Sequence, residues 1–420
     1  MPRLSVVFLC GLCGLGGCAG GRAAALANRT ASPALPGPAA SSAKAQHVVE
    51  LEPLRIDVIQ TARGEETRAY DARSLLDEGN ESLVLHKYDD ALAAYDHLLA
   101  DFPESKLVAP ALFNAGQALE GKDDWAGAAE RYRRLLHDAP ATTELKEDRK
   151  NATFRLAAVL SESGNYPESV RFLEEILDWN DVTPEERVEA LARLGFALIE
   201  TRDYAGAEEV LRSALAFHAE ASARSRFESP YFVSMAQFYL AEIPRLQFLA
   251  IPMRYPEEQM RRDVEQKSQL FQLARDRYVK TVDYRSPYWA TAAVYQVATM
   301  YKEFWDEWMA VPVPADFNAE ETREYVRQVN EEPQLRKLLE KALFFHEKNI
   351  AMARNANVET AWSRESETDV VSVREVLARQ QRGDFVTPGV GQAPGPSSSP
   401  SPDSASVHAP DVYIPPRFDL

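Results

Sequence analysis

The sequence predicts an all-α protein: an α-solenoid of helical hairpins, then a divergent helical C-terminal half, with disordered ends. Two observations support this prediction. One aromatic and two small residues recur in register four times between residues 72 and 217, a pattern typical of stacked helical hairpins. Both ends are instead rich in Ala, Gly, Ser and Pro, a composition that cannot bury enough surface to order a chain.

The first eighteen residues have the layout of a secretory signal peptide. Arg3 precedes an apolar run over residues 4–12, small residues follow, and all three cysteines of the chain fall in this stretch. The apolar run is short for a membrane span of about 20 residues. Later cleavage near residues 23–25, or an uncleaved anchor, are the alternatives.

The string Leu15-Gly16-Gly17-Cys18 resembles the lipobox of bacterial lipoprotein signals. In that family the chain is cut before the cysteine, whose thiol is lipidated. The resemblance implies a signal peptide over residues 1–17 and lipidation of Cys18, with Ala19 favouring the periplasmic face of the outer membrane. A secreted or periplasmic soluble protein is the alternative localisation.

The net charge and the hydropathy of the chain limit the classes of partner that we expect it to bind. The formal net charge is −17, and becomes −18 without residues 1–17 because Arg3 is their one charged residue. An acidic chain is repelled by phosphate backbones, so we expect no nucleic-acid partner. No later segment has the length and apolarity of a membrane span, so the acyl chains would be the only membrane attachment.

Two segments are expected to precede the helices. Residues 18–46 have a tether-like composition and predict a flexible linker. Residues 47–70 alternate apolar and polar side chains with a period of two, which predicts a short extended segment of one or two strands.

Four repeats are predicted over residues 71–222. Their turn aromatics are spaced by 37, 41 and 38 residues: Tyr88, Trp125, Tyr166 and Tyr204. A small residue stands nine positions before each aromatic and another stands three positions after it: Gly79 and Ala91, Gly116 and Ala128, Ala157 and Ser169, Gly195 and Ala207. Small residues let two antiparallel helices approach closely, and each hairpin leaves a bare face that stacking buries.

This pattern resembles the tetratricopeptide repeat (TPR) family. The first two units also carry the family's second aromatic and closing proline, as Tyr95 and Pro103, then Tyr132 and Pro140. The units are longer than the 34 residues of the family, which implies lengthened loops. Unit three departs from the pattern with Ala157, Ser169 and no closing proline.

The resemblance also implies a binding groove lined by the first helices of the repeats. Its contact positions lie twelve and eight residues before each turn aromatic: Leu76 and Asn80, Phe113 and Gln117, Phe154 and Ala158, Ala192 and Phe196. Three phenylalanines on one face are candidate peptide anchors, with packing between neighbouring repeats as the alternative role.

The rest of the chain is expected to be helical but irregular. Residues 223–365 predict degenerate repeats, interrupted at Pro244, Pro252 and Pro256, with an aromatic-rich helix near 288–308 that favours core packing. Residues 366–420 predict a mostly disordered Pro/Ser-rich tail. Its last ten residues are apolar enough to dock on a partner or on the protein's own groove, although chance composition is the favoured explanation.

No catalytic, metal or cofactor site is predicted. The seven histidines form no pair at metal-ligand spacing, no phosphate-binding glycine loop or nucleophile elbow is present, and acidic pairs such as Glu174-Glu175 are typical of solvated helix faces.

The two resemblances together imply a non-enzymatic scaffold or assembly factor in the bacterial envelope that binds protein partners through its groove. Such TPR lipoproteins include secretin pilotins, β-barrel assembly partners and motility-complex subunits. The alternative is an accessory protein that binds or modifies peptidoglycan through a cleft in the C-terminal half.

Overall fold

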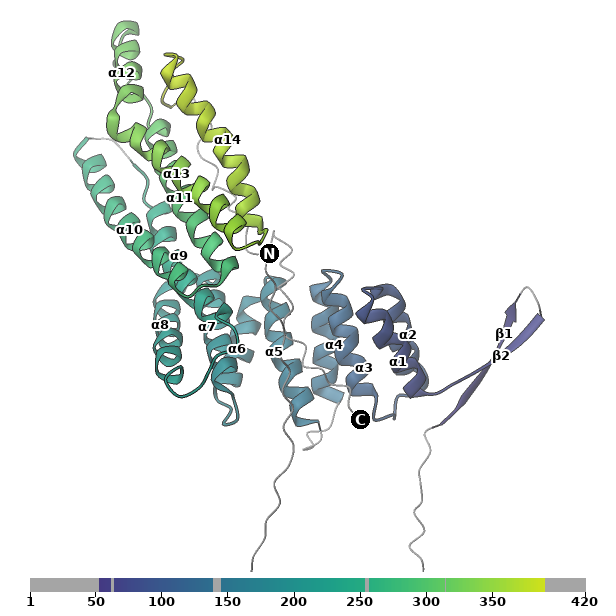
Figure 1. The fold of residues 1–420 in the computed structure, drawn as a ribbon. Coiled ribbons are helices and arrows are strands. Elements are labelled where there is room, and N and C mark those ends of the chain that lie inside the picture. Colours follow the sequence, from purple (N-terminus) through teal and green to yellow (C-terminus); the bar gives the residue numbers. More distant parts are fainter. Residues whose placement is uncertain (1–52, 62–63, 139–144, 254–256, 314, 390–420) are drawn as a thin grey trace, which may run out of the picture. The chain divides into compact units, whose positions relative to one another are not determined.

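A computed structural model describes residues 53–61, 64–138, 145–253, 257–313 and 315–389. Within these ranges the chain forms one two-stranded antiparallel hairpin and fourteen α-helices (Figure 1). The prediction of an all-α fold is therefore confirmed for the described residues, which add only this one hairpin to the helices. The strands β1 (Arg55–Thr61) and β2 (Gly64–Tyr70) pair with Arg55 opposite Tyr70, in the segment where period-two alternation predicted extended chain.

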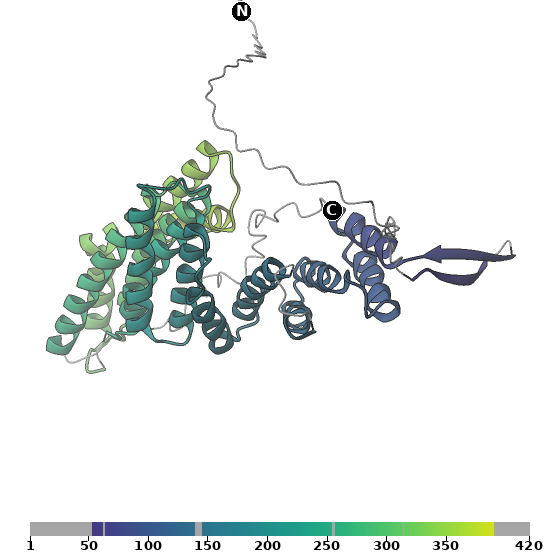
Figure 2. The same cartoon turned by 90° about the horizontal axis from the view of Figure 1, so that it is seen from below.

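The predicted repeats are four helical hairpins that pack on one another in chain order (Figure 2). They pair α1 (Ala72–Val84) with α2 (Tyr88–Asp101), α3 (Val108–Glu120) with α4 (Trp125–Asp138), α5 (Lys146–Glu162) with α6 (Tyr166–Leu177), and α7 (Pro184–Glu200) with α8 (Tyr204–Ala221). Each turn aromatic is the first residue of its second helix. Half-buried there, these rings pack against the hydrophobic core.

All four turns share one backbone device, two residues before the aromatic. His86, Asp123, Gly164 and Arg202 have φ angles of 56°, 58°, 75° and 66°. The next N–H in each turn donates to a carbonyl of the preceding helix, as in Lys87 to Ser82 (2.8 Å) and Asp203 to Leu198 (2.9 Å). This is the Schellman arrangement that ends a helix and satisfies its last carbonyls. Only one of the four left-handed positions carries a glycine, so the sequence pattern did not reveal them.

The small residues of the repeats are buried. We expected the glycines of the first helices to face small residues of the second helices, but they face large side chains. A Cβ on Gly116 would lie 2.6 Å from ring carbons of Tyr132, and one on Gly79 would overlap the ring of Tyr95 in the same way. Gly195 meets the side chain of Leu211. Each glycine thus makes room for the large side chain seven residues after the turn aromatic. Ala91, Ala128 and Ala207 are fully buried on the second helices.

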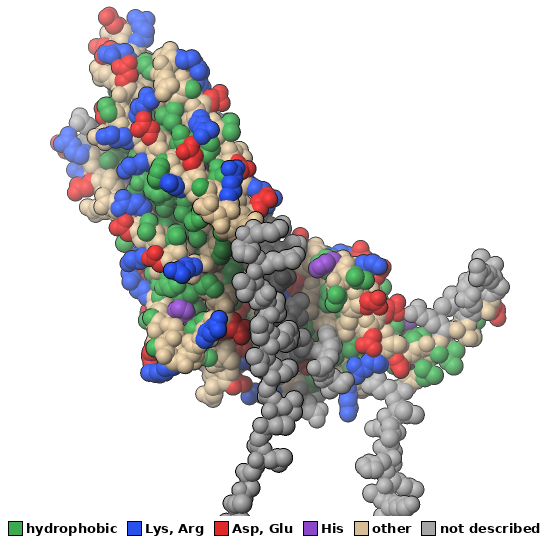
Figure 3. Space-filling model, in the orientation of Figure 1, with side chains coloured by type: hydrophobic (Ala, Val, Ile, Leu, Met, Phe, Trp, Pro, Cys, Tyr) green, Lys and Arg blue, Asp and Glu red, His purple; other side chains and the backbone are tan. Residues whose placement is uncertain are grey.

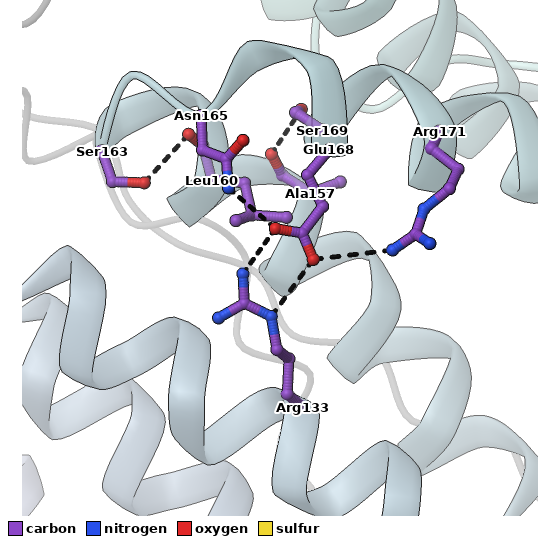
Figure 4. A network of polar contacts seen from close by, with 8 residues as sticks. All are labelled: Arg133, Ala157, Leu160, Ser163, Asn165, Glu168, Ser169 and Arg171. Atoms are coloured by element: carbon purple, nitrogen blue, oxygen red, sulfur yellow. Dashed lines mark hydrogen bonds and ion pairs between the residues drawn. The ribbon is translucent and has the colours of Figure 1, made fainter.

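Repeat three, which departs from the pattern, is held by polar contacts at its turn (Figure 4). The Ser169 hydroxyl donates to the Ala157 carbonyl at 2.7 Å and contacts the Ser161 hydroxyl at 2.8 Å, so the buried polar group is satisfied. Arg133 of α4 forms a bidentate pair with Glu168 at 3.2 and 2.7 Å, which ties repeat two to repeat three.

Six helices form the C-terminal half: α9 (Tyr231–Leu249), α10 (Glu257–Asp283), α11 (Pro287–Ala310), α12 (Ala319–Glu331), α13 (Pro333–Asn355) and α14 (Ala361–Gln381). The α9–α10, α11–α13 and α13–α14 pairs make the main contacts. The aromatic-rich helix is core, as its composition favoured, since Trp289, Tyr301 and Trp305 are buried in one cluster that extends from α7 to α14.

Two expectations for this half were wrong. Pro244 does not interrupt the chain, because α9 continues through it. The tail predicted from residue 366 begins later, because α14 continues to Gln381 and buries Trp362, Val370 and Val373. Because α14 is rich in charged residues, the sequence analysis did not recognise the apolar stripe by which this helix packs on α11 and α13. Of the described helices, none combines the length and the apolarity needed to cross a membrane.

Candidate interaction surface

The first helices of the repeats form one continuous face. Contacts link α1 to α3, α3 to α5, α5 to α7 and α7 to α9, so residues at equivalent positions of these helices are neighbours. The predicted groove residues lie on these helices.

Three of the predicted groove contacts are wrong. Ala192 is 0% exposed, Leu76 is 2% exposed and Phe196 is 5% exposed, so none of these side chains is accessible to a peptide. Phe196 packs between Tyr166 and Tyr239, with ring centroids 5.9 and 4.8 Å away. Its role is packing between repeats, because α9 covers the position that would be open at the end of a shorter array.

The other predicted positions are partly accessible. Asn80 accepts hydrogen bonds from the Tyr95 hydroxyl at 2.9 Å and the Asn114 amide at 2.7 Å, which fixes its side chain. Gln117, Phe113 and Phe154 are half-buried. Their role as peptide contacts stays a prediction.

Two ion pairs that the sequence analysis missed lie on the same face. Arg155 of α5 pairs with Glu120 of α3 at 2.9 Å, and Arg193 of α7 pairs with Glu189 at 2.8 Å, all with side chains less than a quarter exposed. Both arginines stand eleven residues before a turn aromatic, directly beside the groove position at twelve. This shared position within the repeat is the sequence signal that could have identified the two arginines.

Burial shapes the electrostatics of these pairs. Burial raises the pKa of Glu120, against the opposing effects of Arg155 and the Tyr132 hydroxyl. Burial by itself would lower the pKa of Arg193, but Glu189, Tyr231 and Glu162 together raise it. The Arg193 side chain therefore stays charged in a poorly hydrated setting, where a further hydrogen bond to an anion or carbonyl is strong.

Aromatic rings continue the surface beyond repeat four. The Arg193 guanidinium lies 5.2 Å from the ring centroid of Phe232, and Tyr231 lies 6.0 Å from Tyr288. Burial raises the pKa of Tyr231, so its hydroxyl stays protonated. We call this set the first-helix strip: Phe113, Gln117, Glu120, Phe154, Arg155, Glu189, Arg193 and Phe232.

The strip suits recognition of an extended protein segment. It alternates aromatic edges with arginine groups that present donors, and it spans successive first helices and α9. Aromatic and arginine side chains are the types that dominate protein-binding energetics.

A serine, a histidine and a carboxylate do meet in the C-terminal half. His346 Nδ1 lies 3.2 Å from the Ser366 hydroxyl, and its Nε2 lies 3.7 Å from Asp369. Ser366 is 0% exposed and His346 is 1% exposed, so no substrate reaches the hydroxyl. This constellation is core packing rather than a nucleophilic site.

The alternative role in peptidoglycan binding predicted a cleft in residues 223–365. A shallow depression of about 470 Å³ lies at the α13–α14 turn. Its two carboxylates are both paired with arginine, Glu367 with Arg354 at 3.1 Å and Glu359 with Arg364 at 3.6 Å. Among the residues that the structure describes, no three His, Cys, Asp or Glu side chains are grouped as metal ligands. Cys18 lies outside the described residues.

Comparisons with known proteins support the repeat assignment. The family model described as "Tetratricopeptide repeat" matches residues 110–142, which contain the second predicted repeat. No curated protein matches the sequence.

Several solved structures are similar over part of the chain. MamA from Desulfovibrio magneticus RS-1 is 16% identical with a TM-score of 0.32, covering 49% of this chain and 96% of that one. A tetratricopeptide repeat protein from Parabacteroides merdae is 14% identical with a TM-score of 0.36, covering 74% and 98%. Pseudomonas aeruginosa pilF is 13% identical with a TM-score of 0.38, covering 71% and 97%. At these TM-scores they carry no conclusion about this chain.

Proposed function

We propose that this chain is a non-enzymatic scaffold or assembly factor of the bacterial envelope, lipid-anchored through Cys18, that binds a protein partner with its first-helix strip. The strip is the observation that carries the proposal. It offers half-buried aromatic rings and two carboxylate-paired arginines along a face built from consecutive repeats, one of which matches the TPR family.

The anchor supports this role through effective concentration. A lipidated Cys18 with a linker over residues 19–46 keeps the helices at one membrane surface. Binding to a membrane-bound partner then gains from confinement without any new contact. The acyl chains would be the membrane attachment, with nucleic acid excluded by the net charge of −17.

The anchor is tested by the intact mass of the mature protein from solubilised envelopes. We expect an N-terminus at an acylated Cys18, and a Cys18→Ala variant that leaves the membrane fraction. An unmodified N-terminus beyond residue 18 would overturn the anchor while leaving the strip untouched.

The strip is tested by photo-crosslinking in intact cells, with a crosslinker at Gln117 or Ala158. We expect one or a few membrane-complex subunits to be captured, and Arg193→Gln to reduce capture at least fivefold. The matched control is Arg134→Gln, which removes an i, i+4 pair with Asp138 at 3.2 Å on the second helix α4.

Equal capture by the two variants would contradict binding at the strip. Capture of cell-wall fragments alone would favour the role in peptidoglycan binding instead. Circular dichroism of both variants separates lost binding from lost folding.

A further inference from the structure

One face of α13 carries an unusual combination of aromatic and basic side chains. Lys337, Lys341, Phe344, Phe345 and Lys348 follow the spacing i, i+4, i+7, i+8 and i+11, which places them on one helical stripe. Phe344 is 51% exposed and the three lysines are exposed. We call this set the α13 stripe.

The stripe rests on a stack of rings that spans three helices. Phe345 stacks on Tyr301 of α11, with ring centroids 5.7 Å apart and planes at 8°, and Tyr301 contacts Phe271 of α10 at 4.7 Å. Phe344 meets the edge of Phe345 at 5.3 Å. Because buried partners hold these rings, the apolar surface is rigid and ready to receive a ligand. Apolar side chains gather over this part of the molecule, with basic and acidic ones around them (Figure 3).

The α13 stripe is positively charged, whereas the whole chain has a negative net charge. Lys341 lies 5.3 Å from the Tyr301 ring centroid and Lys348 lies 5.4 Å from that of Phe344. None of the three lysines has an ion pair with a carboxylate in the described part of the chain.

The neighbouring acids do not neutralise these lysines. Glu340 pairs with Arg336 at 2.9 Å and Glu347 pairs with Arg374 at 2.6 Å. A chain with net charge −17 therefore presents a local surface of three lysines without a carboxylate partner among the described residues, two of which lie over aromatic rings. Its complement is an acidic segment that contains aromatic residues and proline.

The chain itself supplies such a segment. Residues 411–419 read Asp-Val-Tyr-Ile-Pro-Pro-Arg-Phe-Asp, with an acid at each end and two aromatics and one arginine between, so the segment has a formal net charge of −1. The Pro-Pro pair favours the extended polyproline conformation that aromatic surfaces recognise at low entropic cost.

The last described residues place this segment within reach. The Gly389 N–H donates to the Met309 carbonyl at 2.9 Å, so the chain leaves the described part beside the end of α11. The Asn330 side-chain amide donates to the Val386 carbonyl at 2.8 Å and accepts from the Val386 N–H at 3.2 Å. Tyr301 precedes Met309 by eight residues, about 12 Å along the helix. A flexible chain as long as the stretch from Gly389 to Asp411 would span about 25 Å, enough to reach the stripe.

We propose that residues 411–419 dock in cis on the α13 stripe, with the two aromatic residues on Phe344 and the acids at the lysines. This proposal does not depend on the first-helix strip or on the lipid anchor.

The first test uses a fluorescein-labelled peptide of residues 409–420 and two forms of the protein, the full chain and a chain ending at Pro410. By fluorescence anisotropy we expect the shortened chain to bind the peptide with a micromolar Kd. The full chain should bind at least tenfold more weakly, because its own tail competes at an effective concentration of about 1 mM.

The second test uses variants of the shortened chain. Lys348→Glu and Phe344→Ser should each weaken peptide binding at least tenfold. Both side chains are exposed, so folding is preserved and circular dichroism checks it. The matched control is Arg323→Glu on α12, an exposed position with the same change of charge. Tyr413→Ser/Phe418→Ser in the peptide should abolish binding.

Several outcomes overturn the proposal. They are absence of binding to the shortened chain, equal losses from Lys348→Glu and Arg323→Glu, and equal affinity of the full and shortened chains. A dimer in light scattering that forms only with the tail present would overturn docking in cis and place the segment on a second copy.

Discussion

Single residues decide how closely the two helices of each repeat approach. Gly79 and Gly116 lie where the rings of Tyr95 and Tyr132 press against the first helix, at distances that leave no room for a Cβ. Repeat three solves the same problem differently, with Ala157 in the glycine position and Leu173 in place of the ring. The small residue and the large side chain therefore form one packing unit.

We expect Gly116→Ala to lower the free energy of unfolding by about 1–3 kcal/mol, because the new methyl group overlaps a buried ring. Urea unfolding followed by circular dichroism measures the change. The double variant Gly116→Ala/Tyr132→Leu introduces the residue pair of repeat three, so the two losses should be less than additive. Strict additivity would mean that the ring and the glycine are not coupled.

His346 gives the fold a dependence on pH. Burial lowers its pKa to about 4, whereas the imidazole of an unfolded chain titrates near 6.5. Between these values the unfolded chain binds more protons than the folded one. The contribution of His346 is fully present above about pH 6.5 and is lost as the pH falls towards 4, with a limit on the order of 3 kcal/mol.

The expected measurement is a drop in Tm between pH 7 and pH 5 that is smaller in His346→Gln. Asp369 faces the imidazole and burial raises its pKa, so the His346→Gln/Asp369→Asn double variant separates their effects. An unchanged pH dependence in both variants would contradict this account.

At the scale of elements, α9 shows how a helix continues through a proline. Pro244 lacks the N–H that would bond to the Leu240 carbonyl. The buried guanidinium of Arg277 on α10 donates to that carbonyl instead, at 2.8 Å, and pairs with Glu208 of α8 at 2.6 Å. Lys267 of α10 similarly bonds the Phe248 and Ile251 carbonyls at the end of α9, at 2.6 and 2.8 Å. The second helix thus completes the hydrogen bonding of the first.

We expect Arg277→Met to cost about 2–4 kcal/mol, since it leaves a carbonyl and the Glu208 carboxylate without this partner. Pro244→Ala restores a backbone donor to Leu240 and should recover about 1 kcal/mol in the Arg277→Met background. Thermal unfolding of the four members of this cycle tests the link. The same effect of Pro244→Ala in both backgrounds would show that the proline and the arginine are independent.

At the scale of the whole molecule, the hydrophobic core does not divide where the repeat pattern ends. The largest cluster includes Phe196 of α7 and Leu211 of α8 together with residues of α9 to α14. The boundary predicted between residues 222 and 223 therefore crosses a continuous core. Repeat arrays are stabilised by such interfaces between neighbours rather than by each unit alone.

A fragment of residues 183–389 should therefore unfold in one cooperative transition, whereas a fragment of residues 223–389 should expose the α9 surface, melt at a lower temperature and bind a hydrophobic dye. Thr183 is a suitable start because it caps α7 in a capping box with Glu186. Equal Tm values for the two fragments would indicate that α7 and α8 contribute little to the C-terminal core.

The sequence by itself determined the four hairpins, the first residue of every second helix and the small residues between them. These features depend on spacings within about forty residues, and such local patterns are visible in the chain. The sequence also separated the aromatic core helix from the surface.

Only the tertiary structure decided which candidate groove residues are accessible. Phe196 is buried because Tyr239, which is distant in the sequence, covers it. The passage of α9 through Pro244 depends on Arg277, and the length of α14 depends on apolar contacts with α11 and α13. Each of these outcomes follows from a contact between distant segments, and a local pattern does not specify its partner across such a distance.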